Sequence, residues 1–521
     1  MFKQLGKVLH SELSENNALL HAHEINKIDR HFSYDNFRKS ADYCARALSE
    51  IGAAEVEVIP HPADGVTTYM DCVMPMAWDV RKARLEIVAP AGSNPKVLAD
   101  LKENPFTIGM WSPPTKPGGD EAEVVLEEDM WAGADVRGKI VLNSTIHHPR
   151  TIKKEVAKRG GLGVISDWTE SYLDTPDGIY WNNEWSQTVG GWYGGTKEDA
   201  EQSPIWCISI TPRTGLYLRK LMSNKKTPVR LRATIDTRLY EGTINTITGI
   251  IPGKSKHASE VLMLAHLYEP MPADNAAGAG ATLEILRAIK SLIDQGRLLQ
   301  PEKTIRILLS QELYGFSAYL ATHSDVRSRV IAALNIDDIC FDQKRSGLPV
   351  SVITNPDAQA SFTDVLFTDI ARHCFTTYAP LLTWKTQRGN GSDDTFVSDP
   401  TIGIPVNWVI SSSGRYHHNS MNNFSCLDPE MLRVNMMINA TFAYFVASVG
   451  VREAAWLGSR IASEARKKMI EEVENQLALC LLRNDPDIGK AFENLRRRLD
   501  YLKFVEINRL VSLKNIAGSQ D

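Results

Sequence analysis

Polar side chains that can bind a metal follow two apolar segments in the second half of the chain. His266 lies at the end of the segment VLMLAHL, and Asp274 follows it after a proline-rich loop. Asp337 and Asp338 close the apolar segment VIAALNI. A carboxylate in apolar surroundings is costly unless it binds a cation or is fully hydrogen-bonded. Imidazole and carboxylate groups are zinc ligands, so these residues are candidates for a metal site. The alternative for Asp274 is that it only caps a helix.

Three further residues extend this set. Glu312 follows the apolar segment TIRILLSQ, where it is a metal ligand, a general base or simply a group in the first turn of a helix. His417 and His418 lie in a polar loop beyond the segment VNWVIS, and the alternative for them is a pair of exposed loop histidines. Functional groups of α/β folds gather where strands end, so the ordered set predicts one site.

The elements that position these residues alternate between strand and helix patterns over 241–450. This alternation predicts an α/β sandwich with a mixed, largely parallel sheet. Residues 1–80 join the same domain, because a helix pattern over 33–53 precedes the strand pattern AEVEVIPH. Residues 81–240 are rich in Gly, Pro and Trp with short strand patterns, which indicates a small β-rich domain inserted into the larger one.

Two other regions have uncertain roles. The segment 180–195 holds five aromatic residues among glycines, and it is either the core of the insert or a mobile aromatic lid in which Trp192 contacts substrate. Residues 451–521 are helical in pattern and are split by a break at 484–487. They form either a helical hairpin packed on the core or an element through which copies of the chain associate into a homo-oligomer.

Composition excludes several classes of protein. The 521 residues suffice for two to four domains, and a net charge of −5 argues against a broad basic face for nucleic acid. No apolar run approaches the roughly 20 residues that span a bilayer, so we expect no membrane partner. Seven scattered cysteines and the lack of a signal-peptide pattern predict a cytoplasmic protein with reduced thiols.

The ordered motifs resemble those of zinc metallopeptidase family twenty-eight, which contains aminopeptidases and glutaminyl cyclases. The motifs that carry the resemblance are His266, Asp274-Asn275, Gln311-Glu312, Asn335-Ile336-Asp337 and Tyr416-His417-His418. The segments DVRGKIVL and GGLGVI in the insert are similar to a protease-associated domain, which some members of the family carry. Such a domain shapes access to the substrate cleft.

The chain also departs from the family pattern, like a divergent branch in which HxCHP and PETIG replace the usual motifs. Tyr268 stands where the family often has an aspartate, and Asn422 stands where the family has a second aspartate. The family's Glu-Glu pair, in which the first is the base and the second binds a second zinc, has become Gln311-Glu312. The resemblance therefore implies one zinc, or one held tightly and one loosely.

The resemblance implies a zinc-dependent hydrolase that cleaves an amide bond, most simply an aminopeptidase or related exopeptidase acting on a peptide or small amide. In that interpretation His266, Asp274 and Asp337 hold one metal. Asp274 bridges to a second position that His418 completes, with His417 as the alternative ligand. Glu312 is the general base, although a role as ligand stays open.

Two arginines are candidates for binding a substrate carboxylate through a fork-like pair of hydrogen bonds: Arg388, and Arg415 beside the histidines. Two other functions remain open. One is a zinc amidohydrolase or cyclase-like enzyme that acts on a specialised small molecule. The other is a non-catalytic binding protein whose second metal site has decayed.

Overall fold

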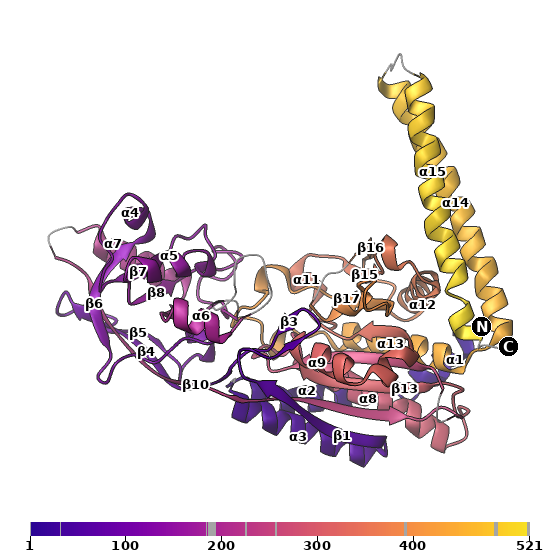
Figure 1. Ribbon diagram of the computed structural model, residues 1–521, viewed down its shortest axis with the longest axis horizontal. Helices are drawn as coiled ribbons and strands as arrows, with labels where there is room; N and C mark the ends of the chain where they lie inside the picture. The colour runs from indigo at the N-terminus through magenta and orange to yellow at the C-terminus, as the bar shows by residue number, and fades with distance from the viewer. Residues whose placement is uncertain are drawn as a thin grey trace.

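The computed structural model describes residues 2–31, 33–183, 185, 194–224, 227–255, 258–389, 393–483 and 488–517. Three parts follow one another along the molecule (Figure 1). A β-rich region occupies one end, a layered body lies in the centre, and a pair of long helices rises from the other end.

The body is built on a mixed eight-stranded sheet, which confirms the predicted fold class. β12 lies in the middle of the sheet and pairs in parallel with β13 and β14, and β14 pairs in parallel with β17. The strands in sheet order are β1 (Ala54–Ala63), β11 (Gly242–Ile251), β13 (Thr304–Gln311), β12 (Glu260–Leu267), β14 (Val330–Asn335), β17 (Val406–Ile410), β15 (Val350–Thr354) and β16 (Trp384–Arg388).

Helices cover both faces of this sheet, because its central strands are apolar on both sides. In β12, Val261 and Met263 belong to the core on one face, whereas Leu262 and Leu264 belong to the core on the other. The first face carries α2 (Glu15–Asp29), α3 (Tyr34–Ile51), α8 (Ala276–Asp294), α12 (Phe362–Tyr378) and α13 (Pro429–Ser448); the second carries α9 (Tyr314–Thr322) and α10 (Ser324–Arg329).

The β-rich region contains a second, seven-stranded sheet, and the long pair β4 and β10 connects it to the body. The strands in sheet order are β5 (Val97–Asp100), β4 (Ala77–Ala89), β10 (Arg230–Tyr240), β6 (Asp120–Leu126), β7 (Ile140–Leu142), β8 (Gly163–Ser166) and β9 (Trp206–Ser209). Its helices are α4 (Glu127–Trp131), α5 (Lys153–Lys158), α6 (Lys197–Gln202) and α7 (Pro212–Met222), and the hairpin β2 (Thr68–Tyr69) and β3 (Cys72–Val73) precedes it.

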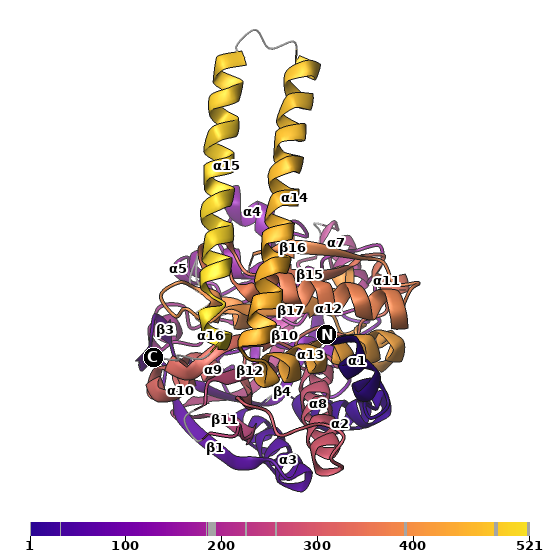
Figure 2. The same cartoon turned by 90° about the vertical axis from the view of Figure 1, so that its right-hand side faces the viewer.

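The C-terminal segment is an antiparallel helical hairpin that stands clear of the body (Figure 2). It consists of α14 (Val451–Arg483) and α15 (Ile488–Val511), followed by the short α16 (Lys514–Ala517). The remaining helices are α1 (Phe2–His10), which packs on α13, and α11 (Gln343–Ser346). Within the described part of the chain, no helix has the length and apolar character needed to cross a membrane.

Candidate metal centre

The predicted ligands meet at one edge of the eight-stranded sheet, beyond the carboxyl ends of its central strands. His266 is the last residue but one of β12, and Asp337 follows β14 by two residues. Asp274 immediately precedes α8, but the N-cap of this helix is Asn275, whose side chain accepts a 3.1 Å hydrogen bond from the Gly278 N–H. Because Asn275 performs the capping, the carboxylate of Asp274 is available to the site.

Asp274 lies between the two histidines and directs one oxygen toward each. His266 Nε2 is 3.3 Å from Asp274 Oδ1 and 3.3 Å from Asp337 Oδ1, while His418 Nε2 is 3.5 Å from Asp274 Oδ2. Two ligand atoms bound about 2.0–2.1 Å from a tetrahedral zinc are roughly 3.3 Å apart. The spacing of these buried donors therefore fits a zinc ion on either side of Asp274.

Glu269 also belongs to this cluster, although sequence reasoning did not select it. Its side chain is buried, and its Oε2 lies 3.8 Å from His418 Nε2. This oxygen accepts no hydrogen bond from any residue that the structure describes, and ligand atoms of His266, Glu269 and Asp274 lie within 4.8 Å of one another. The available signal was the motif HLYEP, in which Glu269 occupies the position of the second histidine of HxCHP.

The buried charged groups of the cluster shift one another's pKa values. Burial, followed by repulsion from Asp274, raises the pKa of Glu269 well above its usual range and also raises the pKa of Asp337. Burial by itself would lower the pKa of His266, but Glu312 and the nearby aspartates raise it well above the ordinary value. Burial would raise the pKa of Asp274, but its contacts with the two histidines hold this pKa well below the usual range.

Several residues around the centre have left-handed backbone conformations that are unfavourable without glycine. They are Tyr268 with φ 79°, Leu313 with φ 58°, Asp338 with φ 46° and His418 with φ 48°. Such conformations cost of order 1–3 kcal/mol each, persist only where the surroundings enforce them, and cluster at functional sites. Each of these residues lies within two positions of a predicted site residue or is one, which marks the same edge of the sheet as functional.

Two buried carboxylates outside the cluster hold its backbone in place. Asp29, at the end of α2, accepts a 3.0 Å hydrogen bond from the Tyr268 N–H, and burial raises the pKa of Asp29 to about 7. Asp338 accepts a 3.1 Å hydrogen bond from the Ser413 N–H and so ties β14 to the histidine loop. Neighbouring Asp337 and Asp338 thus have different partners: one faces the histidines, and the other supports the loop that carries His418.

The insert forms one wall of the site. The Trp181 N–H donates a 2.5 Å hydrogen bond to the His418 carbonyl, and the Trp181 and His418 rings are 5.2 Å apart. A Cβ at Gly178 would lie 2.0 Å from Asn419 Oδ1, so only glycine permits this close approach of the insert to the histidine loop. Beside the centre is a cavity of about 50 Å³ lined by Met110, Trp111, Trp181, Asn183, Leu267, Tyr268, Glu269, Gln311, Glu312, Leu313 and Tyr314.

The other predicted site residues lie in different surroundings. Glu312 lines the small cavity next to Glu269. The His417 side chain is 45% exposed and stacks on His418, with its Nδ1 3.9 Å from Glu170. His418 rather than His417 therefore approaches Glu269, although both histidines have a ring nitrogen within 4.8 Å of Asp274 ligand atoms.

The two arginines have protein partners. Arg415, which is close to the two histidines in sequence, pairs with Asp174 of the insert at 3.0 Å. Arg388 pairs with Asp357 at 2.7 Å, beside the base of the helical hairpin and not among the metal-site residues. Their roles in binding a substrate carboxylate stay predictions, and for Arg388 the contacts indicate a structural role instead. Trp192 lies outside the described residues.

Comparison with solved structures places this fold among known peptidases. The chain is similar to a peptidase M28 precursor from Shewanella amazonensis SB2B, with 17% identity, a TM-score of 0.61, and coverage of 86% of this chain and 96% of the other. It is also similar to a zinc aminopeptidase from Bacillus subtilis, with 18% identity, a TM-score of 0.58, and coverage of 84% of this chain and 96% of the other. It is similar as well to an aminopeptidase from Aneurinibacillus sp. strain AM-1, with 17% identity, a TM-score of 0.51, and coverage of 85% of this chain and 97% of the other.

Among curated proteins, no sequence matches this chain significantly. The family model described as peptidase family M28 matches residues 246–443, which include every residue of the metal-site cluster. This match agrees with the fold, with the order of the motifs and with the grouping of His266, Asp274 and His418. Residues 246–443 are therefore similar to peptidase family M28, a family of metallopeptidase hydrolases.

Proposed function

We propose that this protein is a zinc-dependent aminopeptidase or related exopeptidase. The observation that carries the proposal is the position of Asp274, which is buried and directs its two oxygens at His266 and His418, 3.3 Å and 3.5 Å away. A carboxylate shared by two imidazoles suits a bridge between two metal positions.

The residues present fit two positions of unequal strength. His266, Asp274 and Asp337 would hold the first ion, and Asp274, His418 and Glu269 would hold the second. The first set has the 3.3 Å spacing of zinc ligands, whereas the second includes a longer 3.8 Å contact. We therefore expect that a second ion would be bound more weakly than the first. When bound, zinc polarises the scissile carbonyl and lowers the pKa of water toward about 7.

Glu312 is the proposed general base. It lines the cavity beside Glu269, and its negative charge acts on His266. In this role its carboxylate takes a proton from the attacking water and returns it to the leaving amine, so that one group acts as base and then as acid. Gln311, which precedes it, cannot take a proton, and its side chain instead accepts a 3.2 Å hydrogen bond from Tyr34.

The walls of the cavity limit what binds beside Glu312. A volume of about 50 Å³ accommodates a few water molecules and not a large side chain, so substrates must either be small at this point or displace part of the wall. Met110, Trp111 and Trp181 of the insert form one side of that wall. This arrangement is consistent with an insert that controls access to the site.

A chromogenic aminoacyl-anilide series tests the proposal. The full chain, stripped with chelator and then titrated with zinc, should regain hydrolysis, and substrates with small first residues should be preferred. Recovery only on small non-peptide amides, or cyclisation of amino-terminal glutamine, would support the amidohydrolase or cyclase alternative. Zinc binding without turnover on any of these substrates would refute an enzyme of this class and favour a binding protein.

A further inference from the structure

One face of the projecting hairpin is apolar and exposed. On α14, Ile470, Val473 and Leu477 recur at i, i+3 and i+7, and on α15 Phe492 and Leu499 are one heptad apart. Ile470 is 58% exposed, Leu477 57% and Phe492 69%. We refer to this as the groove face, because a shallow groove of about 490 Å³ runs along it, lined by Met469, Ile470, Val473, Glu474, Leu499, Asp500 and Lys503.

The groove face is turned away from the body. The side of α14 that faces the body carries Glu464, Lys467 and Glu471, which line a separate polar cavity of about 470 Å³ together with residues of α12 and β16. At 100° per residue, Ile470 and Leu477 lie more than a quarter turn around α14 from Glu464 and Glu471, and about 60–80° from Lys467 at the edge of that side. The apolar stripe is therefore not a continuation of the contact between hairpin and body.

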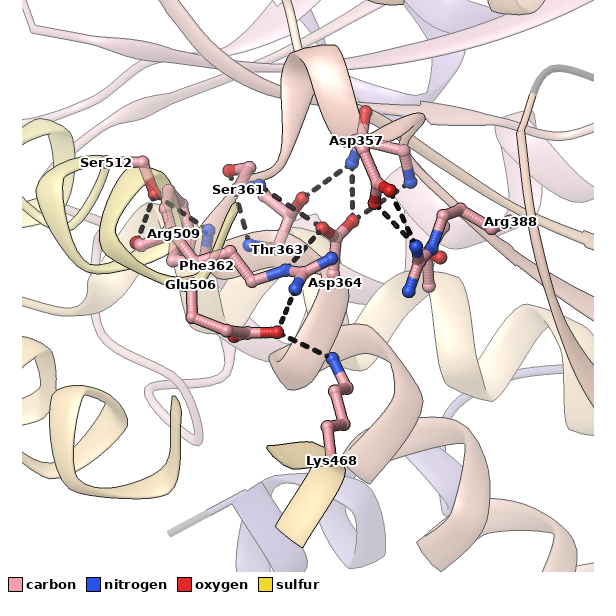
Figure 3. A network of polar contacts seen from close by, with 12 residues as sticks. Asp357, Ser361, Phe362, Thr363, Asp364, Arg388, Lys468, Glu506, Arg509 and Ser512 are labelled. Atoms are coloured by element: carbon pink, nitrogen blue, oxygen red, sulfur yellow. Dashed lines mark hydrogen bonds and ion pairs between the residues drawn. The ribbon is translucent and has the colours of Figure 1, made fainter. Parts of the chain in front are cut away.

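Buried polar contacts fix the direction in which the hairpin projects (Figure 3). Arg509 of α15 donates a 3.1 Å hydrogen bond to Asp364 of α12 and also pairs with Glu506. Lys468 of α14 reaches the same Glu506 at 2.9 Å, so both helices are tied to one network at their base. A face held in a fixed direction loses little conformational freedom when it binds a partner.

We propose that the groove face binds the same face of a second copy, so that two hairpins form a four-helix bundle around a two-fold axis parallel to the hairpin. The charges favour this occupant. α14 carries the acidic run Glu471–Glu474 and α15 the basic run Arg496–Arg498 at the same level, since Glu472 and Arg498 pair at 2.5 Å within the hairpin. The proposed axis places α14 against the partner's α15, and therefore Glu474 opposite the partner's Arg496.

A two-fold axis across the hairpin at the level of Glu474 would instead place α14 against α14, with Glu474 facing the partner's Glu474. Like charges at that contact are unfavourable, so the parallel axis is preferred. In the preferred arrangement every helix is also antiparallel to both neighbours, as in four-helix bundles with up-down topology.

The available area is sufficient for a stable dimer. α14 is about 50 Å long at 1.5 Å per residue, and two helices about 10 Å wide give a face of about 1,000 Å². Stable interfaces bury about 800 Å² per partner. Near the base the stripe continues through the small residues Ala455, Ser459 and Ala462, which permit close approach of helices. The hairpin stands at one end of the long axis, so the second body lies on the far side of the bundle (Figure 1).

Sedimentation equilibrium of the full-length protein tests this proposal. The wild type should be a dimer at micromolar concentration, and Phe492→Glu should raise the dimer dissociation constant at least tenfold, because it places a charge in the interface. Phe504→Glu is the matched control: Phe504 is on the same helix and 59% exposed, but it lies more than a quarter turn around the helix from Phe492 and Leu499. This control variant should remain dimeric.

A charge exchange tests the orientation of the two hairpins. Glu474→Arg and Arg496→Glu should each weaken the dimer, and the double variant should restore it, because each pair then has opposite charges again. A monomeric wild type at about 100 μM would overturn the proposal, as would equal effects of the two phenylalanine substitutions. A stable dimer that the double variant fails to restore would overturn the proposed axis.

Discussion

Replacing Glu269 by glutamine should have opposite effects on the stability of the metal-free and zinc-bound protein. Glu269 and Asp274 are both buried, and their oxygens lie within 4.8 Å of each other in the metal-binding group. Two ionised carboxylates at that distance repel by about 3 kcal/mol at an effective dielectric constant of about 20. In the wild type, proton uptake by the carboxylates already relieves part of this repulsion. Replacing Glu269 by glutamine should therefore stabilise the metal-free protein by about 1–2 kcal/mol, which is less than the full repulsion.

With zinc present the effect should reverse. Loss of a supporting contact to a metal ligand weakens metal affinity about 10–100-fold, and loss of a ligand should weaken it at least as much. Each tenfold loss of affinity removes about 1.4 kcal/mol of the stabilisation that excess zinc provides. The zinc-dependent gain in stability should therefore fall clearly in the Glu269→Gln variant.

Thermal unfolding with chelator and with excess zinc measures both effects in one assay. Glu170→Gln is a suitable control, because Glu170 is the carboxylate nearest His417 but its side chain is 43% exposed. This variant should resemble the wild type under both conditions. Should Glu269→Gln destabilise the chelated protein and leave the zinc-dependent shift unchanged, Glu269 would be a structural group and the reasoning about the second metal position would be wrong.

Three further substitutions test the roles assigned to individual residues. Glu312→Gln should keep the fold and zinc content but lose turnover by about 10²–10⁴-fold, whereas loss of zinc would make Glu312 a ligand. His418→Ala should reduce zinc content more than His417→Ala, because His418 approaches Asp274 and Glu269 from the buried side; the reverse order in elemental analysis would exchange their roles. Asp29→Ala should weaken zinc affinity about 10–100-fold with partial rescue by Asp29→Asn, and unchanged affinity would limit Asp29 to a structural role.

The fold and the family were predictable from the sequence because their signals are local. Apolar strand patterns such as VLMLAHL and TIRILLSQ coincide with β12 and β13, and the break at 484–487 separates α14 from α15. Strand ends are also where α/β folds collect functional groups. His266, Asp274, Asp337 and His418 could therefore be placed together before their distances were known, and the structure brings them within a few ångströms of one another.

Contacts made by distant segments could not be predicted in the same way. Asp29 supports Tyr268 across 239 positions of sequence, and no local pattern distinguishes Asp29 from other helix-end aspartates. Arg388 is a plausible anion-binding residue by type, but its pairing with Asp357 depends on where β16 lies in the sheet. Glu269 could have been selected from the sequence, because its position in the motif HLYEP was visible there. Only its burial beside the histidines required the structure.

Zinc content is the most direct test of the metal centre. The wild-type chain and Asp274→Asn, both expressed with ample zinc and shown to be folded by circular dichroism, are dialysed against metal-free buffer and analysed for metal. Because Asp274 faces both histidines, we expect the wild type to retain at least one zinc per chain and Asp274→Asn to retain much less. A folded wild type without zinc, or an Asp274→Asn variant with equal zinc, would contradict the proposed centre.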